Sequence, residues 1–317
     1  MTDTQKEVFK TPVNKIRLFE HGAPGSQNLK LTRKYYTEDM PDGRVKHIVQ
    51  NITDPDIVPY IPDGIGNSTD RQRIPAVLII PGGAFRRLVY NFEGEDVAKW
   101  LNSMGIAAFV LECRLPSDEH DNAENVPLID AMRAMRVIRG RAQEFGIDEA
   151  KIGVMGFSAG GFMAALLSTA YESDVYADYK YKDEYDKLSA RPDFAVCSYP
   201  VISIDDCIEA GKRYMSEEQV LKRISDSKAK ILHKYNPDKL VRPDMPPVFI
   251  CETDDDRTTL SENSVGFYIA ARKAGVSAEL HIFRTGGHGY GCGDDFAQTG
   301  EWKVLFTKWI KSIGIIS

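Results

Sequence analysis

A serine suited to covalent catalysis stands in the pattern Gly-Phe-Ser-Ala-Gly at positions 156–160. An apolar run precedes the pattern and a helix-like stretch follows it. In a G-x-S-x-G turn between a strand and a helix, the serine backbone is strained and its Oγ is presented above the sheet. The flanking glycines are needed because the strand and the helix leave no room for side chains. The pattern alone is common by chance, but this context makes Ser158 a candidate nucleophile for acyl transfer.

A second glycine-rich turn is suited to stabilising the charge that acyl transfer creates. Negative charge builds on the carbonyl oxygen, and removing one preplaced N–H donor costs roughly 3–4 kcal/mol. Residues 81–85, Pro-Gly-Gly-Ala-Phe, follow another apolar run and are expected to supply one or two such donors. The N–H group of Ala159, directly after the serine, is expected to supply another. A Gly-Gly turn alone would be an ordinary tight turn.

A nucleophilic serine also requires a base and an acid that orients the base. Of the six histidines, only His288 lies in a glycine-rich loop, at 286–289, just after the last expected strand. His281 falls inside that strand and is expected to be structural. The acid should lie at the end of the preceding strand, where the sequence offers Asp254, Asp255 and Asp256. The remaining histidines are expected at the surface: His21, His47, His120 and His233.

The elements that must position these residues alternate along the chain from about residue 74. Short apolar, β-branched runs predict strands at Ala76–Ile80, Ala107–Glu112, Ile152–Gly156, Phe194–Tyr199, Val248–Glu252 and Ala278–Phe283. Amphipathic stretches predict helices at Glu95–Met104, Pro127–Phe145, Gly160–Ala170, Glu262–Ala274 and Glu301–Ile313. Near-continuous apolar strands alternating with helices of this length predict a mostly parallel, doubly wound α/β sheet of about eight strands, covered on both faces.

Two regions depart from this alternation. Residues 1–73 form a polar lead-in with extended segments, Val45–Asn51 and Ile57–Pro62, that are expected to add antiparallel strands at one edge. Residues 202–244 are rich in charge and separate two core strands by more than a crossover needs. Such an insertion is expected to form a helical cap beside the active site. The alternative is a solvated helical excursion without a catalytic part. The whole chain, 1–317, is expected to form one domain.

With these motifs in place, the chain resembles the small bacterial α/β-hydrolases related to acetyl xylan esterases and feruloyl-esterase-like carbohydrate esterases. The resemblance extends from about residue 12 to the C-terminus. It rests on residues 74–85, 93–101, 127–131, 146–161, 188–194, 199–202, 262–264 and 287–289. The resemblance implies an α/β-hydrolase fold, whose topology places the catalytic residues along the chain in the order Ser, Asp, His.

Carried onto this sequence, the family pattern implies Ser158 as nucleophile and His288 as base. It implies oxyanion donors at Gly83, Ala84 and Ala159. Aligning residues 262–264 with the family places the acid at Asp256. The Val-Pro that usually follows the acid is Thr-Leu here, at 259–260, so Asp255 and Asp254 stay open as alternatives.

The resemblance implies a serine esterase that hydrolyses short-chain, above all acetyl, esters of carbohydrates such as acetylated xylo-oligosaccharides. Phe85, Tyr199 and Tyr290 flank the catalytic loops and are candidates for the wall of a small acyl pocket or for stacking on a sugar, with core aromatics as the alternative. The competing functions are a general short-chain carboxylesterase, a peptidase of the prolyl oligopeptidase type and a non-catalytic hydrolase-fold receptor. The peptidase usually carries a large N-terminal propeller, which 73 residues are too few to build.

Composition argues against several other classes. Forty Lys and Arg against 46 Asp and Glu are scattered, so no nucleic-acid groove is expected. No apolar stretch approaches the roughly 20 residues that cross a bilayer, and the polar N-terminus lacks a signal-peptide layout, so a cytoplasmic protein without membrane attachment is expected. The five cysteines lack metal-binding spacing, and Cys113, Cys197 and Cys251 are expected to be buried. No metal or cofactor is expected, and the oligomeric state stays open.

Overall fold

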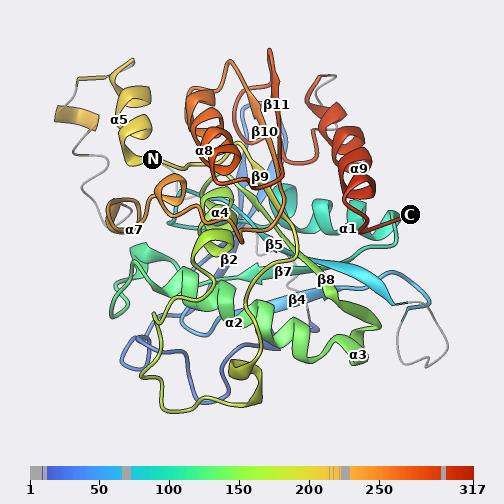
Figure 1. Cartoon of the computed structure of the whole chain (residues 1–317). Helices are drawn as coiled ribbons and strands as arrows, with labels where there is room; N and C mark the ends of the chain where they lie inside the picture. Colours follow the sequence, from blue (N-terminus) through green and yellow to red (C-terminus); the bar gives the residue numbers. More distant parts are fainter. Residues whose placement is uncertain are drawn as a thin grey trace.

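The centre of the molecule is an eight-stranded, mostly parallel sheet (Figure 1). The computed structural model describes residues 9, 13–65, 73–213, 215, 216, 218–220, 222, 229–293 and 298–317. In spatial order the strands are β1 (Ile16–Arg17), β4 (Asp56–Tyr60), β7 (Ala107–Glu112), β5 (Ile74–Ile80), β8 (Ile147–Phe157), β9 (Ala195–Ser198), β10 (Val248–Thr253) and β11 (Ala278–Phe283). The strands from β7 to β11 run parallel, whereas β4 and β1 add antiparallel pairs at one edge.

A second, antiparallel sheet holds β2 (Lys34–Asp39), β3 (Val45–Gln50) and β6 (Leu88–Val89). The extended segment expected at Val45–Asn51 exists as β3, but it does not join the edge of the main sheet as predicted. It pairs with β2 and with β6, where Ile48 lies opposite Val89. The reason is that β6 directly follows the Gly-Gly turn and is too short to stand out in the sequence. Through its strand β6, the small sheet therefore holds the turn that follows β5 in position.

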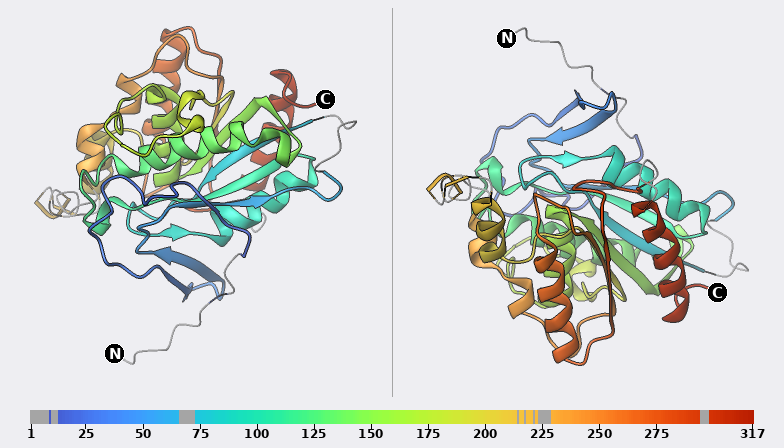
Figure 2. Two further views of the ribbon diagram at one scale, coloured as in Figure 1. Left: turned by 90° about the horizontal axis from the view of Figure 1, so that it is seen from below. Right: turned by 90° about the horizontal axis from the view of Figure 1, so that it is seen from above.

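Helices cover both faces of the main sheet, as the views in Figure 2 show. They are α1 (Asp96–Ser103), α2 (Val126–Gly140), α3 (Ala142–Phe145), α4 (Ala159–Ala170), α5 (Ile204–Lys212), α7 (Ala229–Lys234), α8 (Ser261–Lys273) and α9 (Trp302–Ser312). On one face α1 meets α9 through Trp100, whose ring centroid lies 5.0 Å from that of Trp302. On the other face α2 packs against α4. Short helical turns lie at Asn91–Glu95, Pro116–Asp118, Glu184–Lys187, Pro237–Lys239 and Thr299–Glu301.

The central parallel strands are mostly buried, as continuous apolar runs require, whereas no residue of β11, at the edge of the sheet, is fully buried. All six residues of β7 and all six of β10 are buried. Cys113, Cys197 and Cys251 are buried within this layer, which confirms the role expected for them. Because the strands run parallel, the ends of β5, β8, β10 and β11 meet at one edge of the sheet. The loops that leave this edge therefore lie together.

The described part of the 202–244 insertion lies between two helices of the core. At its start the N–H groups of Ile202 and Ser203 donate to Asn263 Oδ1 of α8, over 2.9 and 3.0 Å. At the end of α7, Lys234 Nζ and the Tyr235 hydroxyl donate to Asn125 Oδ1, directly before α2, over 2.7 and 2.8 Å. The insertion is therefore held to α8 at its start and, at the end of α7, to the residue that precedes α2.

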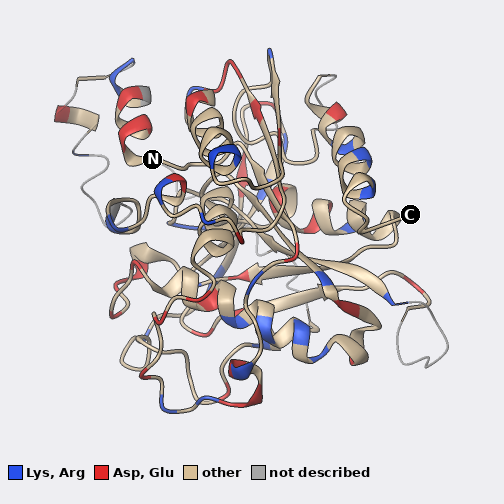
Figure 3. Cartoon of the chain, viewed as in Figure 1, with Lys and Arg blue, Asp and Glu red and all other residues tan. Residues whose placement is uncertain are grey.

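Charged residues of both signs are interspersed over the described ribbon, without a continuous basic track (Figure 3). Among the helices described, none is long and apolar enough to cross a bilayer.

Candidate active site

Ser158 lies in the sharp turn between β8 and α4. Its backbone has φ 54° and ψ −117°, a strained conformation for a residue with a side chain. A Cβ atom at Gly156 would lie 1.9 Å from the carbonyl oxygen of Gly160, and one at Gly160 would lie 1.9 Å from the carbonyl oxygen of Ile80. Neither position can therefore hold a side chain, which explains both glycines of the motif.

The loop after β11 brings His288 to this serine. His288 Nε2 lies 2.9 Å from Ser158 Oγ, and His288 Nδ1 lies 2.6 Å from Asp256 Oδ2. Gly286 and Gly287 have φ values of 154° and 64°, so the loop that precedes the histidine depends on glycine. Serine, imidazole and carboxylate thus form a continuous chain of polar contacts, with residues from the ends of three parallel strands.

The three consecutive aspartates occupy different environments. Asp256 is buried, and its Oδ1 accepts the N–H groups of Thr258 and Thr259 over 2.6 and 3.0 Å. Burial alone would raise the pKa of Asp256, but the hydrogen bond and charge of His288 and these N–H donors outweigh it and hold the pKa below its usual value. Asp255 is exposed and accepts the N–H of Gly287 over 2.8 Å. The side chain of Asp254 is also exposed. Only Asp256 contacts the histidine among these three.

The predicted oxyanion donors border the serine on two sides. Gly83 and Ala84 lie in the turn between β5 and β6, where their φ values are 137° and 57°. Ala159 is the first residue of α4, where the helix dipole favours negative charge. Within the described residues, the N–H groups of Gly83, Ala84 and Ala159 donate to no protein acceptor. These N–H groups are therefore available to a substrate oxygen.

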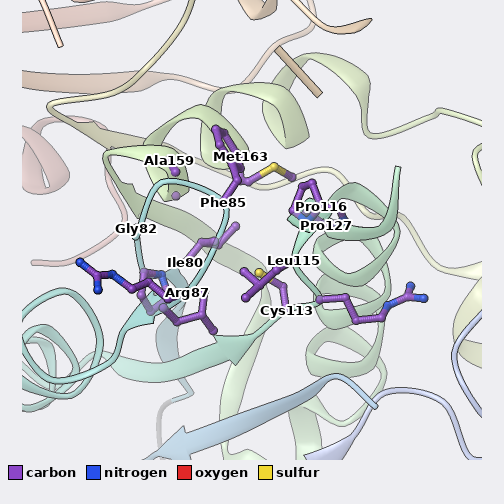
Figure 4. A pocket seen from close by; sticks show the side chains of 14 residues that line it. Ile80, Gly82, Phe85, Arg87, Cys113, Leu115, Pro116, Pro127, Ala159 and Met163 are labelled. Atoms are coloured by element: carbon purple, nitrogen blue, oxygen red, sulfur yellow. The ribbon is translucent and has the colours of Figure 1, made fainter. Parts of the chain in front are cut away.

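A small apolar pocket adjoins these donors (Figure 4). Its volume is about 10 Å³, space for about one water molecule. Phe85, Leu115 and Met163 are among the residues that line it, together with Gly82 and Ala159. The pocket is thus narrow, apolar and next to the serine.

Two of the three aromatic residues proposed for the pocket do not line it. Tyr199 is fully buried, and its ring centroid lies 5.0 Å from that of His288. Tyr290 packs against Tyr199 with centroids 4.5 Å apart and is also buried. Both belong to the hydrophobic core, because the ring of Tyr199 packs against the rings of both His288 and Tyr290. Phe85 alone of the three borders the pocket.

Sequence reasoning missed one polar residue in this region, Glu93. It is buried beneath the turn after β5, and its Oε2 accepts the N–H of Gly82 over 2.7 Å. The signal was present, since Glu93 lies in a segment that carries the family resemblance. Nothing in the local pattern, however, indicates that its side chain points inward. No group of three or more His, Cys, Asp or Glu side chains suited to a metal ion exists among the residues described.

Comparisons with known proteins find similar folds and sequences. The chain is 34% identical to an acetyl ester-xyloside bifunctional hydrolase from Caldicellulosiruptor lactoaceticus, with TM-score 0.72 over 96% of this chain and 97% of that one. A carboxylesterase from Lactobacillus plantarum shares the fold at 19% identity, with TM-score 0.67 over 90% of this chain and 99% of that one. The fold is the α/β-hydrolase fold, as predicted.

Two curated relatives match the chain at 31% identity. One is an acetylxylan esterase of Xylanibacter ruminicola, matched over 75% of this chain and 45% of the relative. The other is an endo-1,4-beta-xylanase B of Butyrivibrio fibrisolvens, matched over 71% and 34%. The chain therefore spans less than half the length of these curated relatives. The BD-FAE family model matches residues 65–270, which is more than half of the chain. The chain belongs to the BD-FAE family.

Proposed function

We propose that this protein is a serine esterase that hydrolyses short-chain acyl esters, with acetylated carbohydrates such as acetylated xylo-oligosaccharides as substrates. The observation that carries the proposal is the contact chain from Ser158 Oγ to His288 Nε2 and from His288 Nδ1 to Asp256, over 2.9 and 2.6 Å. These distances suit proton transfer between a nucleophile, its base and an orienting acid. A general short-chain carboxylesterase is the alternative.

In the proposed mechanism, Ser158 Oγ attacks the ester carbonyl while His288 Nε2 accepts its proton. The Asp256 carboxylate holds the imidazole in the tautomer whose Nε2 is free to accept. The N–H groups of Gly83, Ala84 and Ala159 stabilise the oxyanion. Protonated His288 then donates its proton to the alkoxide oxygen as the ester C–O bond breaks. The acyl group stays bound to Ser158 Oγ as an acyl-enzyme. Finally His288 activates a water molecule that releases the acid and regenerates Ser158.

The acyl group is proposed to be small because the pocket beside Ala159 is small. A volume of about 10 Å³ with apolar walls suits a methyl group far better than an alkyl chain. The alcohol is proposed to be a sugar because relatives from three organisms are described as an acetylxylan esterase, a xylanase and an acetyl ester-xyloside hydrolase. A small-molecule or oligosaccharide ester is thus the proposed partner.

Covalent labelling tests the nucleophile. Wild-type protein is expected to react with a fluorophosphonate probe, and Ser158→Ala is expected to lose the label entirely. Ser168→Ala is a matched control, because Ser168 is a buried serine of the same helix whose Oγ donates only to the carbonyl of Ala164. It should label as wild type does. A folded wild type that stays unlabelled would favour the non-catalytic receptor.

The acyl and alcohol parts of the proposed substrate are tested with the same protein preparations. Nitrophenyl esters should be hydrolysed with kcat/KM that falls at least about tenfold from acetyl to octanoyl, since a narrow pocket excludes added methylenes. A preference for octanoyl esters would contradict the small-acyl proposal. Acetate release from acetylated xylo-oligosaccharides, compared with simple alkyl acetates, tests the sugar. Cleavage of prolyl peptides in place of esters would favour the peptidase.

A further inference from the structure

Glu93 is a buried carboxyl group in an unusual backbone turn. Residues Asn91–Glu95 form a π-helical turn in which the N–H of Glu95 donates to the carbonyl oxygen of Tyr90, over 2.8 Å. Such turns are rare and often lie at functional sites. The turn places Glu93 in the interior, where it is 4% exposed. Within the described part of the chain, no arginine or lysine forms an ion pair with it.

Both carboxylate oxygens of Glu93 are instead occupied by groups that lead to the active site. Oε2 accepts the N–H of Gly82 over 2.7 Å, and Oε1 accepts the hydroxyl of Tyr199 over 2.9 Å. The Tyr199 oxygen in turn accepts the N–H of Gly291 over 3.1 Å. Gly82 precedes the proposed oxyanion donors, and Gly291 follows His288 by three residues. One carboxylate therefore connects the oxyanion turn with the histidine loop.

The contacts around this connection are close. A Cβ atom at Gly82 would lie 2.7 Å from Glu93 Oε2 and 2.9 Å from the Cβ of Ser158. The carboxylate, the turn and the nucleophile are thus packed without spare space. Tyr199 has φ 36°, a strained value for a non-glycine residue, and its ring lies edge-on to that of His288. Strain of this kind persists only where surrounding contacts hold it.

Charges and hydrogen bonds both act on Glu93. Burial raises the pKa of Glu93, while the positive charge of His288, the Tyr199 and Gly82 hydrogen bonds and the charge of Lys46 oppose the rise. The hydrogen bonds that fix the position of the Glu93 carboxyl group are therefore also ones that favour its ionised form.

We propose that Glu93 is a positioning residue for ester hydrolysis: its carboxylate holds the Gly82 turn against Ser158 and, through the Tyr199 hydroxyl, holds the loop of His288. This role rests on the proposed function. Glu93 does not touch the reacting atoms, so it acts through the geometry of the oxyanion turn and of the histidine loop.

Glu93→Gln tests the role with minimal change of shape. An amide can accept only one of the two hydrogen bonds and carries no charge. We expect kcat for nitrophenyl acetate to fall about 10- to 100-fold, the loss typical of a misplaced catalytic group, with KM changed less than about threefold.

Glu112→Gln is the matched control. Glu112 is equally buried but pairs with Lys15 and Arg33 beside the edge strands. Its replacement can lower the melting temperature, and kcat and KM should stay as in wild type. A folded Glu93→Gln protein with wild-type kcat would overturn the proposal.

Tyr199→Phe keeps the proposal testable if Glu93→Gln fails to fold. It removes only the hydroxyl that joins Glu93 to Gly291, so kcat should fall while the change in KM stays small. Wild-type kcat in Tyr199→Phe would also overturn the proposed link. An inactive, unlabelled wild type would contradict the proposed function itself, whereas an active wild type with an unaffected Glu93→Gln contradicts only the role of Glu93.

Discussion

At the scale of residues, the three aspartates at 254–256 show how backbone position alone separates chemically identical groups. The N–H of Asp254 continues the ladder to Phe283, while Asp255 accepts the N–H of Gly287. Asp256 turns inward to His288, and its pKa is held below the usual value despite burial. We therefore expect Asp256 to stay ionised over the pH range in which the proposed hydrolysis is assayed. Any loss of that activity toward acid pH should not come from protonation of Asp256.

Replacing these carboxylates one at a time gives a sharp prediction. Asp256→Asn should lower kcat by about 10⁴, because an amide lets the imidazole adopt the wrong tautomer. Asp255→Asn is the control, and it should lower kcat less than about tenfold because it loses only a loop hydrogen bond. Both are measured on nitrophenyl acetate, with circular dichroism to check folding. Equal losses in the two variants would argue against Asp256 as the acid.

The sequence predicts residues well where the signal is local. Ser158 and His288 stand in glycine-rich turns next to recognisable strands, and the structure brings them together. Glu93 was missed because its partner Tyr199 lies 106 positions away. His120 was expected at the surface but is buried, because its Nδ1 lies 3.0 Å from Ser26 Oγ of the distant lead-in. Side-chain direction set by such remote contacts leaves no trace in a local pattern.

At the scale of elements, continuous apolar runs predict the parallel core closely. The bounds of β7 and β11 agree with the sequence, whereas β8 extends back to Ile147, further than its apolar run indicates. The expected helix at Pro127–Phe145 is divided into α2 and α3 at Arg141. The predicted edge position of β3 was wrong because β3 pairs with β2 and with the short β6, and the sequence pattern indicates neither strand. Patterning thus identifies the elements, and tertiary contacts decide their pairing.

Replacing two helical glycines by alanine tests how tightly the turn that carries Ser158 is packed. Gly160→Ala should abolish activity and destabilise the fold, because the added Cβ would meet the carbonyl oxygen of Ile80 at 1.9 Å. Gly266 lies at an exposed position of α8, with no atom within 4 Å of an added Cβ. Gly266→Ala should therefore raise the free energy of unfolding by about 0.5–1 kcal/mol without changing kcat. Urea unfolding and ester hydrolysis measure both. An active Gly160→Ala would contradict the tight packing of the turn.

At the scale of the whole molecule, the lead-in is tied to the α/β core by buried polar contacts. Arg114 is fully buried, pairs with Asp130 over 2.6 Å and donates to Ser26 over 2.7 Å. The Tyr179 hydroxyl donates to the carbonyl of Gly22 over 2.8 Å, which joins the lead-in to the loop after α4. In Figure 1 the lead-in runs below α2, beside that loop. Stability of the molecule therefore depends on charges buried beneath the N-terminal segment.

His120 makes this dependence sensitive to pH. Burial, and then the positive charge of Arg114, lower the pKa of His120 to about 4. In the unfolded chain this histidine has its ordinary pKa of about 6.5 and therefore binds the proton more tightly. The part of the free energy of unfolding that depends on neutral His120 is fully present above that pH and declines as the pH falls toward 4. His120→Asn keeps a polar atom near Ser26 but cannot be protonated. Between pH 7 and pH 4.5, the free energy of unfolding should therefore fall by about 1–3 kcal/mol less in His120→Asn than in wild type. Urea unfolding at both pH values measures this difference. Parallel pH dependence in the two proteins would show that acid acts elsewhere.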